Sequence, residues 1–216
     1  MKQFLRSAIG LGGKHLGPVI RRVDNSFTVF VLHEITDEPA RFTRDNDIWL
    51  SKRLFKTQME FVRENFNVIS MASLLKGDVP SRAALITFDD GYAGIFRNAL
   101  PILQEMGLPS TVFMNMSPVL GGEYWAERVA YLCNEDPGFQ RFLHEQLGSP
   151  VSHPVLQCTE KIIDEYHQET GIDYLSNLQD YTAEYASLED LEESDADPLV
   201  RSQGTECVWS SVYSSL

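Results

Sequence analysis

Short apolar runs alternate with helix-spaced segments between residues 27 and 114, and this alternation restricts the fold more than any other feature. The runs are too short for buried helices and read as strands: Phe27–Leu32, Asn67–Ser70, Ala83–Phe88 and Ser110–Met114. Apolar residues recur at helical spacing in the segments between them: Ser51–Asn65, Met71–Lys76 and Ile95–Met106. Strands that alternate with helices predict a parallel α/β sheet.

Residues that begin or end helices sharpen these boundaries. Ser51 is placed to cap the first helix, and Gly77 ends the second. Pro101 interrupts the third helical pattern, so it predicts a kink or a new helix start there. Gly107 supplies the stop for that helix. The polar, proline-containing stretch from Thr36 to Asn46 is predicted to be a loop.

Polar residues follow two of the predicted strands directly. His33 comes after the first strand, and Asp89 and Asp90 come after the third, with Gly91 as a turn residue. Parallel sheets place their sites at the carboxyl ends of strands, so these side chains are predicted to converge on one rim. Gly91 permits the strand to turn, which both acids need if they are to face one pocket.

Two adjacent carboxylates at the end of a buried strand are costly, because each raises the pKa of the other unless a cation or hydrogen-bond donors compensate. A bound divalent metal is one such compensation, with one acid as ligand and its neighbour free to act as a base. The alternative is that Asp89 and Asp90 cap the following helix and face solvent.

The segment Thr87–Tyr92, which reads Thr-Phe-Asp-Asp-Gly-Tyr, resembles the first motif of the polysaccharide deacetylases, the NodB-homology domains of carbohydrate esterase family four. The resemblance implies a distorted (β/α) barrel and removal of N-acetyl groups from a sugar polymer or glycolipid. It implies that Asp89 is the catalytic base and that Asp90 ligates a divalent metal. The usual metal of the family is zinc or a similar divalent ion.

Other stretches resemble the same family in the same order over residues 27–125, and more loosely to residue 190. Val31–Glu34 looks like the early strand that ends in a histidine at the sugar-facing rim, which implies a substrate-binding role for His33. Glu123–Trp125 opens what resembles the helical insertion of one branch of the family. Tyr92 and Trp125 are the remaining substrate-binding candidates.

The chain departs from the family where two further metal ligands are expected. The motif His-[Ser/Thr]-x-x-His is missing, since the histidines stand at positions 15, 33, 144, 153 and 167 and none is four residues from another. Either the product is truncated or it is a degenerate relative, and we expect poor metal affinity.

A non-catalytic carbohydrate-binding or interaction module on the same scaffold is therefore the alternative function. A phospho-accepting receiver domain is disfavoured, because no well-placed phospho-acceptor aspartate and late lysine accompany the acidic pair.

The expected organisation is a partial barrel with a helical insertion. It comprises an N-terminal segment (1–22), the first part of the α/β domain (23–123), the insertion (124–190) and an irregular tail (191–216). The net charge of −13 argues against nucleic-acid binding. The apolar runs are too short for a membrane span, although the N-terminal segment could lie at a membrane surface. Cys133, Cys158 and Cys207 are widely spaced, which favours unpaired thiols and a cytoplasmic location.

Overall fold

The computed structural model describes residues 27–147, 160–196 and 206–210, which divide into two compact units. Unit 1 comprises residues 27–38, 49–116, 185–196 and 206–210, and unit 2 comprises residues 39–48, 117–147 and 160–184. The strands are β1 (Thr28–Leu32), β2 (Glu34–Ile35), β3 (Trp49–Leu50), β4 (Asn67–Val68), β5 (Ala83–Phe88), β6 (Thr111–Asn115) and β7 (Glu206–Ser210). The helices are α3 (Arg41–Asp45), α4 (Lys52–Asn65), α5 (Met71–Leu75), the π-helical turn η1 (Ile95–Ala99), α6 (Leu100–Met106), α7 (Met116–Val119), α8 (Trp125–Glu135), α9 (Pro137–Leu147), α11 (Glu160–Thr170), α12 (Leu175–Leu178) and α13 (Leu188–Ala196).

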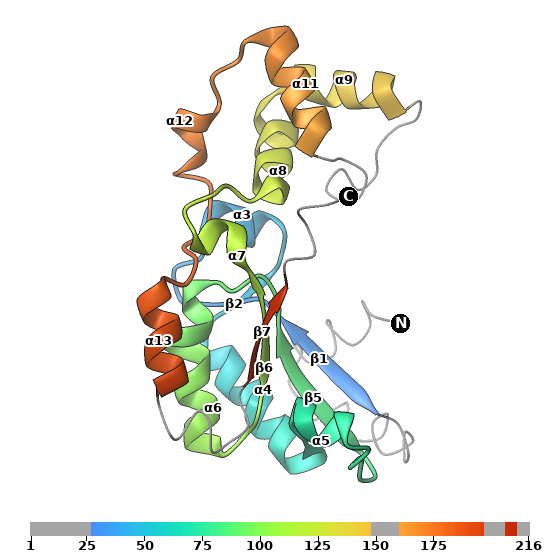
Figure 1. Cartoon of the computed structure of the whole chain (residues 1–216), viewed down its shortest axis with the longest axis vertical. Coiled ribbons are helices and arrows are strands. Elements are labelled where there is room, and N and C mark those ends of the chain that lie inside the picture. The colour runs from blue at the N-terminus through green and yellow to red at the C-terminus, as the bar shows by residue number, and fades with distance from the viewer. Residues whose placement is uncertain (1–26, 148–159, 197–205, 211–216) are drawn as a thin grey trace. The chain divides into compact units, whose positions relative to one another are not determined.

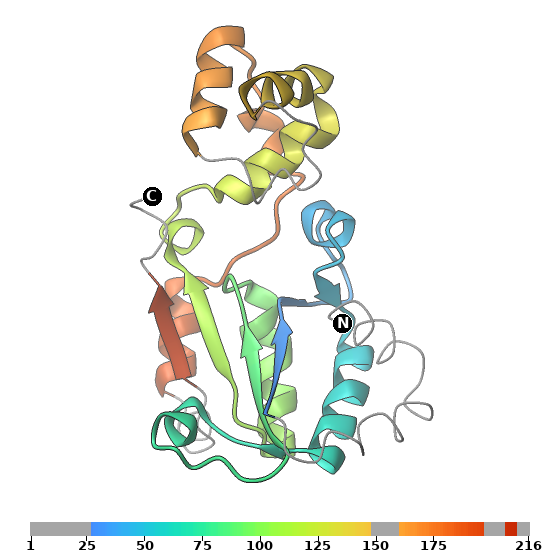
Figure 2. The same cartoon turned by 90° about the vertical axis from the view of Figure 1, so that its right-hand side faces the viewer.

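A parallel sheet forms the centre of unit 1. Its strands run in the order β1-β5-β6-β7, and β4 pairs with the beginning of β5 (Figures 1 and 2). Every residue of β5 is buried, which explains why its sequence is apolar at every position except Thr87 rather than alternating. The predicted parallel α/β architecture is confirmed. In the described part the sheet ends at β1 on one side and β7 on the other, and closure into a barrel stays a prediction.

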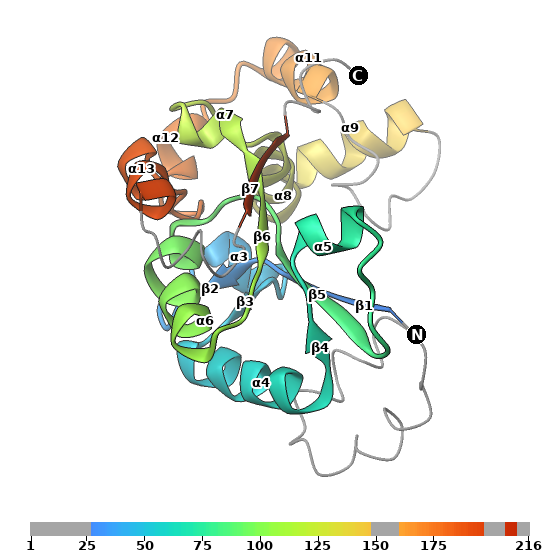
Figure 3. The same cartoon turned by 60° about the horizontal axis from the view of Figure 1, so that its bottom comes forward.

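Helices cover both faces of this sheet. Figure 3 shows α4, α6 and α13 on one side and α5 on the other. Helix α4 turns Phe55, Met59 and Val62 inward at the spacing of one helical face, and all three are buried. None of the described helices combines the length and the apolar surface that a bilayer-spanning segment requires.

The helix boundaries follow the capping residues that the sequence supplies. The Ser51 hydroxyl accepts a hydrogen bond from the backbone N–H of Leu54, 3.3 Å away. Pro101 lies in the first turn of α6, directly after η1. The backbone stays helical across this junction, so Pro101 marks a change from π-helical to α-helical turns rather than a separate helix start. Gly107 ends α6 in the left-handed conformation, with φ +67°.

Unit 2 is helical around its own apolar core. The core residues are buried and come from α8, α9, α11 and the segment before α12: Val129, Leu132, Cys133, Phe139, Phe142, Leu143, Ile163, Tyr166 and Tyr174. The Phe139 and Tyr166 rings meet edge to face, with their centroids 5.0 Å apart. Unit 2 takes up most of the predicted insertion (124–190) and adds residues 39–48.

Two predictions about irregular segments are wrong. Thr36–Asn46, predicted as a loop, contains the short helix α3. The tail 191–216, predicted as irregular, contains the end of α13 and the strand β7, which pairs in parallel with β6. Strand pairing of this kind is made with backbone groups distant in sequence, so side-chain periodicity in the tail gives little sign of it.

Candidate functional site

The turn after β5 is the candidate site, and it lies beside the end of β1. Leu32 pairs with Phe88 in the β1–β5 register, so His33 and Asp89 follow at the same end of neighbouring strands. The backbone N–H of Asp89 donates to the Leu32 carbonyl over 2.9 Å. The structure therefore brings His33, Asp89 and Asp90 to one rim of unit 1.

Two consecutive left-handed residues turn the chain at this point. Asp90 has φ +71° and Gly91 has φ +82°, and aspartate is among the few residues besides glycine that adopt this region. The turn interrupts the strand's alternation of side-chain direction, which is the condition under which both acids could face one pocket. The Asn115 N–H, at the end of β6, donates to the Asp90 carbonyl over 3.2 Å and ties the turn to the next strand.

Gly91 is required for a second reason. A Cβ atom at this position would lie 2.5 Å from Cε of Met114, far inside van der Waals contact. Glycine therefore allows both the left-handed backbone and the close approach of β6.

Asp89 is half-buried, and its surroundings disfavour its charge. Burial raises the pKa of the Asp89 carboxyl above its ordinary value, and the nearby His33 imidazole opposes that shift. A carboxylate with a raised pKa is a stronger proton acceptor than one in free solution. This environment suits a general base.

The other predicted substrate-binding residues lie in different surroundings. Tyr92 is fully buried in unit 1, and its ring centroid lies 4.9 Å from that of Tyr185. Trp125 begins α8 in unit 2, where it packs against the helical core. Both side chains thus contribute to packing, and their contact with substrate stays a prediction.

The metal implied by the family resemblance can be tested against the donors present. Asp90 supplies a suitable oxygen ligand, but a catalytic zinc takes three protein ligands and a water molecule. Within the described residues, no group of three or more histidine, cysteine, aspartate or glutamate side chains could hold a metal ion. Those residues do not by themselves fit a catalytic zinc, so we derive no step through a metal, and ligation by Asp90 stays a prediction.

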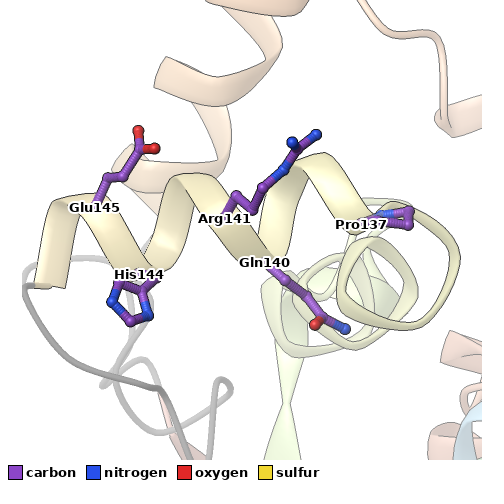
Figure 4. A pocket seen from close by; sticks show the side chains of 5 residues that line it. All are labelled: Pro137, Gln140, Arg141, His144 and Glu145. Atoms are coloured by element: carbon purple, nitrogen blue, oxygen red, sulfur yellow. The ribbon is translucent and has the colours of Figure 1, made fainter.

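A shallow depression of about 320 Å³ on α9 is a weaker candidate. It is lined by Pro137, Gln140, Arg141, His144 and Glu145. Figure 4 shows Arg141 and Glu145 pointing to one side of the helix and Gln140 and His144 to the other. Because these side chains do not converge, the depression offers no constellation for catalysis.

Gly94 and Asn98, which contact the backbone just beyond His33, were not among the residues predicted from the sequence. A Cβ on Gly94 would lie 2.4 Å from the Ile35 carbonyl oxygen, and Nδ2 of Asn98 donates to the same oxygen over 2.8 Å. The available signal in the sequence was a glycine at the start of a helical segment. Glycine weakens a helix, so its presence there suggests that another backbone packs closely against it.

Comparisons with known proteins agree with the motif. Residues 76–130 match the family described as polysaccharide deacetylase. YxkH of Bacillus subtilis (strain 168), assigned to the polysaccharide deacetylases by its name, is 30% identical over 93 residues, which cover 37% of this chain and 33% of that protein. The chain thus spans about a third of that relative's length.

Two solved structures of this kind are similar to the chain. A de-N-acetylase from Aggregatibacter actinomycetemcomitans is similar at 15% identity and a TM-score of 0.44, over 85% of this chain and 53% of that one. A polysaccharide deacetylase from Bacillus cereus is similar at 14% identity and a TM-score of 0.40, over 79% and 69% of the two chains.

The matched segment contains the whole turn from β5 through Asp89, Asp90 and Gly91. Sequence motif, family match and named relative point to one assignment. Over residues 76–130, this chain therefore resembles the polysaccharide deacetylase family.

Proposed function

We propose that this chain is a deacetylase-type hydrolase that removes N-acetyl groups from a sugar polymer or glycolipid, with Asp89 as the general base. The observation that carries the proposal is the half-buried Asp89 carboxyl, at the carboxyl end of β5, with its pKa raised by burial. Perturbed carboxyl groups at the rim of a parallel sheet are typical of catalytic acids and bases.

In the proposed reaction, Asp89 accepts a proton from a water molecule whose oxygen attacks the acetyl carbonyl carbon. The carbon–nitrogen bond then breaks as Asp89 passes that proton to the departing sugar amine, and acetate is released. We assign contact with the sugar beside the reacting amide to His33, which follows the end of the neighbouring strand. The two aspartates have separate roles, since Asp90 is assigned to a metal ion rather than to the proton.

The test is acetate release from N-acetylglucosamine oligomers by the full chain. Asp89→Asn should abolish release, because an amide cannot accept the proton. Asp78→Asn, an exposed aspartate after α5 in the same unit, removes the same charge and should leave release unchanged. Equal rates for wild type and Asp89→Asn would refute the role of Asp89.

A non-catalytic carbohydrate-binding module is the second candidate. It is favoured by the lack of three clustered metal-ligating side chains among the described residues. Saturable binding of the oligomers without acetate release would replace the first candidate with this one.

Zinc titration by calorimetry addresses Asp90 separately. Asp90→Asn is the appropriate variant, since asparagine tolerates the left-handed backbone that Asp90 adopts. A heat of binding that disappears in this variant would support Asp90 as a ligand. Equal heats in both forms would exclude it.

A further inference from the structure

The start of η1 packs against the backbone of the segment that carries His33. Gly94 packs directly on the Ile35 backbone, where an added Cβ would lie 2.4 Å from the carbonyl oxygen and 3.1 Å from the carbonyl carbon. Such separations leave no room for any side chain. The absence of a side chain on Gly94 therefore sets how closely η1 approaches β2.

Asn98 makes the polar half of the same contact. Its Nδ2 donates to the Ile35 carbonyl oxygen over 2.8 Å, between residues 63 apart in sequence. Ile35 is completely buried, and its carbonyl would lose a hydrogen-bond partner in the core without this donor. Asn98 lies in the π-helical turn of η1, and such turns are frequent at functional sites.

The other side of His33 is fixed by the site itself. The Leu32 carbonyl, immediately before His33, accepts from the Asp89 N–H over 2.9 Å. His33 thus lies between two anchored carbonyls, that of Leu32 bound to the acidic turn and that of Ile35 bound to Asn98. The short segment between these anchors leaves His33 little freedom to move away from Asp89.

The helical turn that carries Asn98 is also bound to a neighbouring helix. The adjacent Arg97 guanidinium donates to both oxygens of Asp190 on α13, over 3.1 and 3.0 Å. A donor on a firmly held element can fix the position of its acceptor, whereas a donor on a mobile loop cannot.

We propose that Asn98 is a positioning residue that holds His33 against Asp89 through the Ile35 carbonyl. The inference rests on the proposed function for its consequence in catalysis, but the positioning itself is a geometric claim about this chain. Asn98 touches neither substrate nor the reacting atoms. Its loss should lower kcat about 10- to 100-fold with KM nearly unchanged, because it would misplace groups that are already bound.

The decisive measurement is an NMR double-mutant cycle on the full chain with ¹³C-labelled histidine. His33 is assigned from the resonance missing in His33→Gln, and its shift on Asp89→Asn is recorded at one fixed pH. That response should fall by more than half when Asn98→Ala or Asn98→Asp is also present. Asn98→Asp keeps the shape of the side chain but replaces the donor with an acceptor, and Asn98→Gln, which keeps a donor, should restore part of the response.

Asn65→Ala is the matched control. Its side chain is another partly buried amide in unit 1 that donates to a backbone carbonyl over 2.8 Å, at the end of α4. A merely structural role predicts that Asn65→Ala and Asn98→Ala reduce the response equally, and that result would overturn the proposal. An undiminished response in both Asn98 variants would also overturn it. Acetate release is not part of this readout, so an inactive wild type would count against the proposed function alone.

Discussion

Two partly buried charges, one in each unit, have opposite surroundings. In unit 2, Arg128 is only 13% exposed, and its guanidinium contacts Asp164, Glu123 and the Tyr174 hydroxyl. In unit 1, the half-buried Asp89 has a raised pKa, with His33 as the nearby group that opposes the shift. Unit 2 surrounds a buried charge with partners, whereas the rim of unit 1 disfavours one.

A buried charge can either stabilise the fold or provide a reactive group, and the partners around it decide which. A buried ion with several partners costs little and orders its surroundings. A carboxyl that is desolvated without full compensation reduces stability, and such groups gather at functional sites. The candidate site is therefore assigned to unit 1.

The largest expected effect is on catalysis at Asp89. Asp89→Asn should lower kcat/KM for acetate release by about 100- to 10,000-fold. Its melting temperature should not fall, because a carboxyl whose folded pKa is raised reduces stability once it is ionised. Asp164→Asn in unit 2 should leave the rate unchanged. A large fall in melting temperature for Asp89→Asn would contradict the contrast between the units.

The next largest effect is expected in the unit 2 core. Phe139 is fully buried, and Phe139→Ala should cost about 3–5 kcal/mol of unfolding free energy. Hydrogen exchange should then accelerate in α8 and α11. Unchanged protection of β5 in the same experiment is expected if the two units keep separate cores, and equal acceleration there would show that they unfold together.

Two glycines provide a smaller effect. Gly94→Ala should cost about 1–3 kcal/mol by overpacking against Ile35, and it should also slow acetate release. Gly171 in unit 2 has φ +63° with nothing within 4 Å of an added Cβ, so Gly171→Ala should cost only about 1 kcal/mol. Denaturant titrations measure both. A rate effect from Gly171→Ala, or none from Gly94→Ala, would contradict the role given to the Gly94 contact.

The smallest expected effect concerns Tyr166 in unit 2. Burial, with a hydrogen bond to Asp136, raises the pKa of Tyr166 to about 12. Because the folded pKa is raised, the protonated Tyr166 hydroxyl contributes to the free energy of unfolding. That contribution is complete below the unfolded pKa of about 10 and is lost as the pH rises through about 12. Tyr166→Phe should cost about 1–2 kcal/mol at pH 7 and have a flatter pH dependence in that window. Unfolding curves at several alkaline pH values measure this dependence. If wild type and Tyr166→Phe lose unfolding free energy equally with rising pH, the raised pKa of Tyr166 is wrong.

Local physical chemistry was enough to predict much of unit 1. The mainly apolar run Ala83–Phe88 has the same bounds as β5, because both faces of that strand are buried. Ser51, Pro101 and Gly107 set helix boundaries through their own backbone and capping preferences. Ser187 and Asp190 form a reciprocal cap at the start of α13, which is a further local signal in the sequence.

The sequence by itself determined the alternating order of strands and helices, and it placed the two aspartates at a strand end. Periodicity, caps and turn residues act over a few neighbours, so they can be read from the chain directly. Only the tertiary structure decided that β7 pairs with β6, that Tyr92 is buried beside Tyr185, and that Asn98 supports the backbone after His33. Those contacts join residues far apart in sequence, and their stability depends on packing that no local pattern encodes.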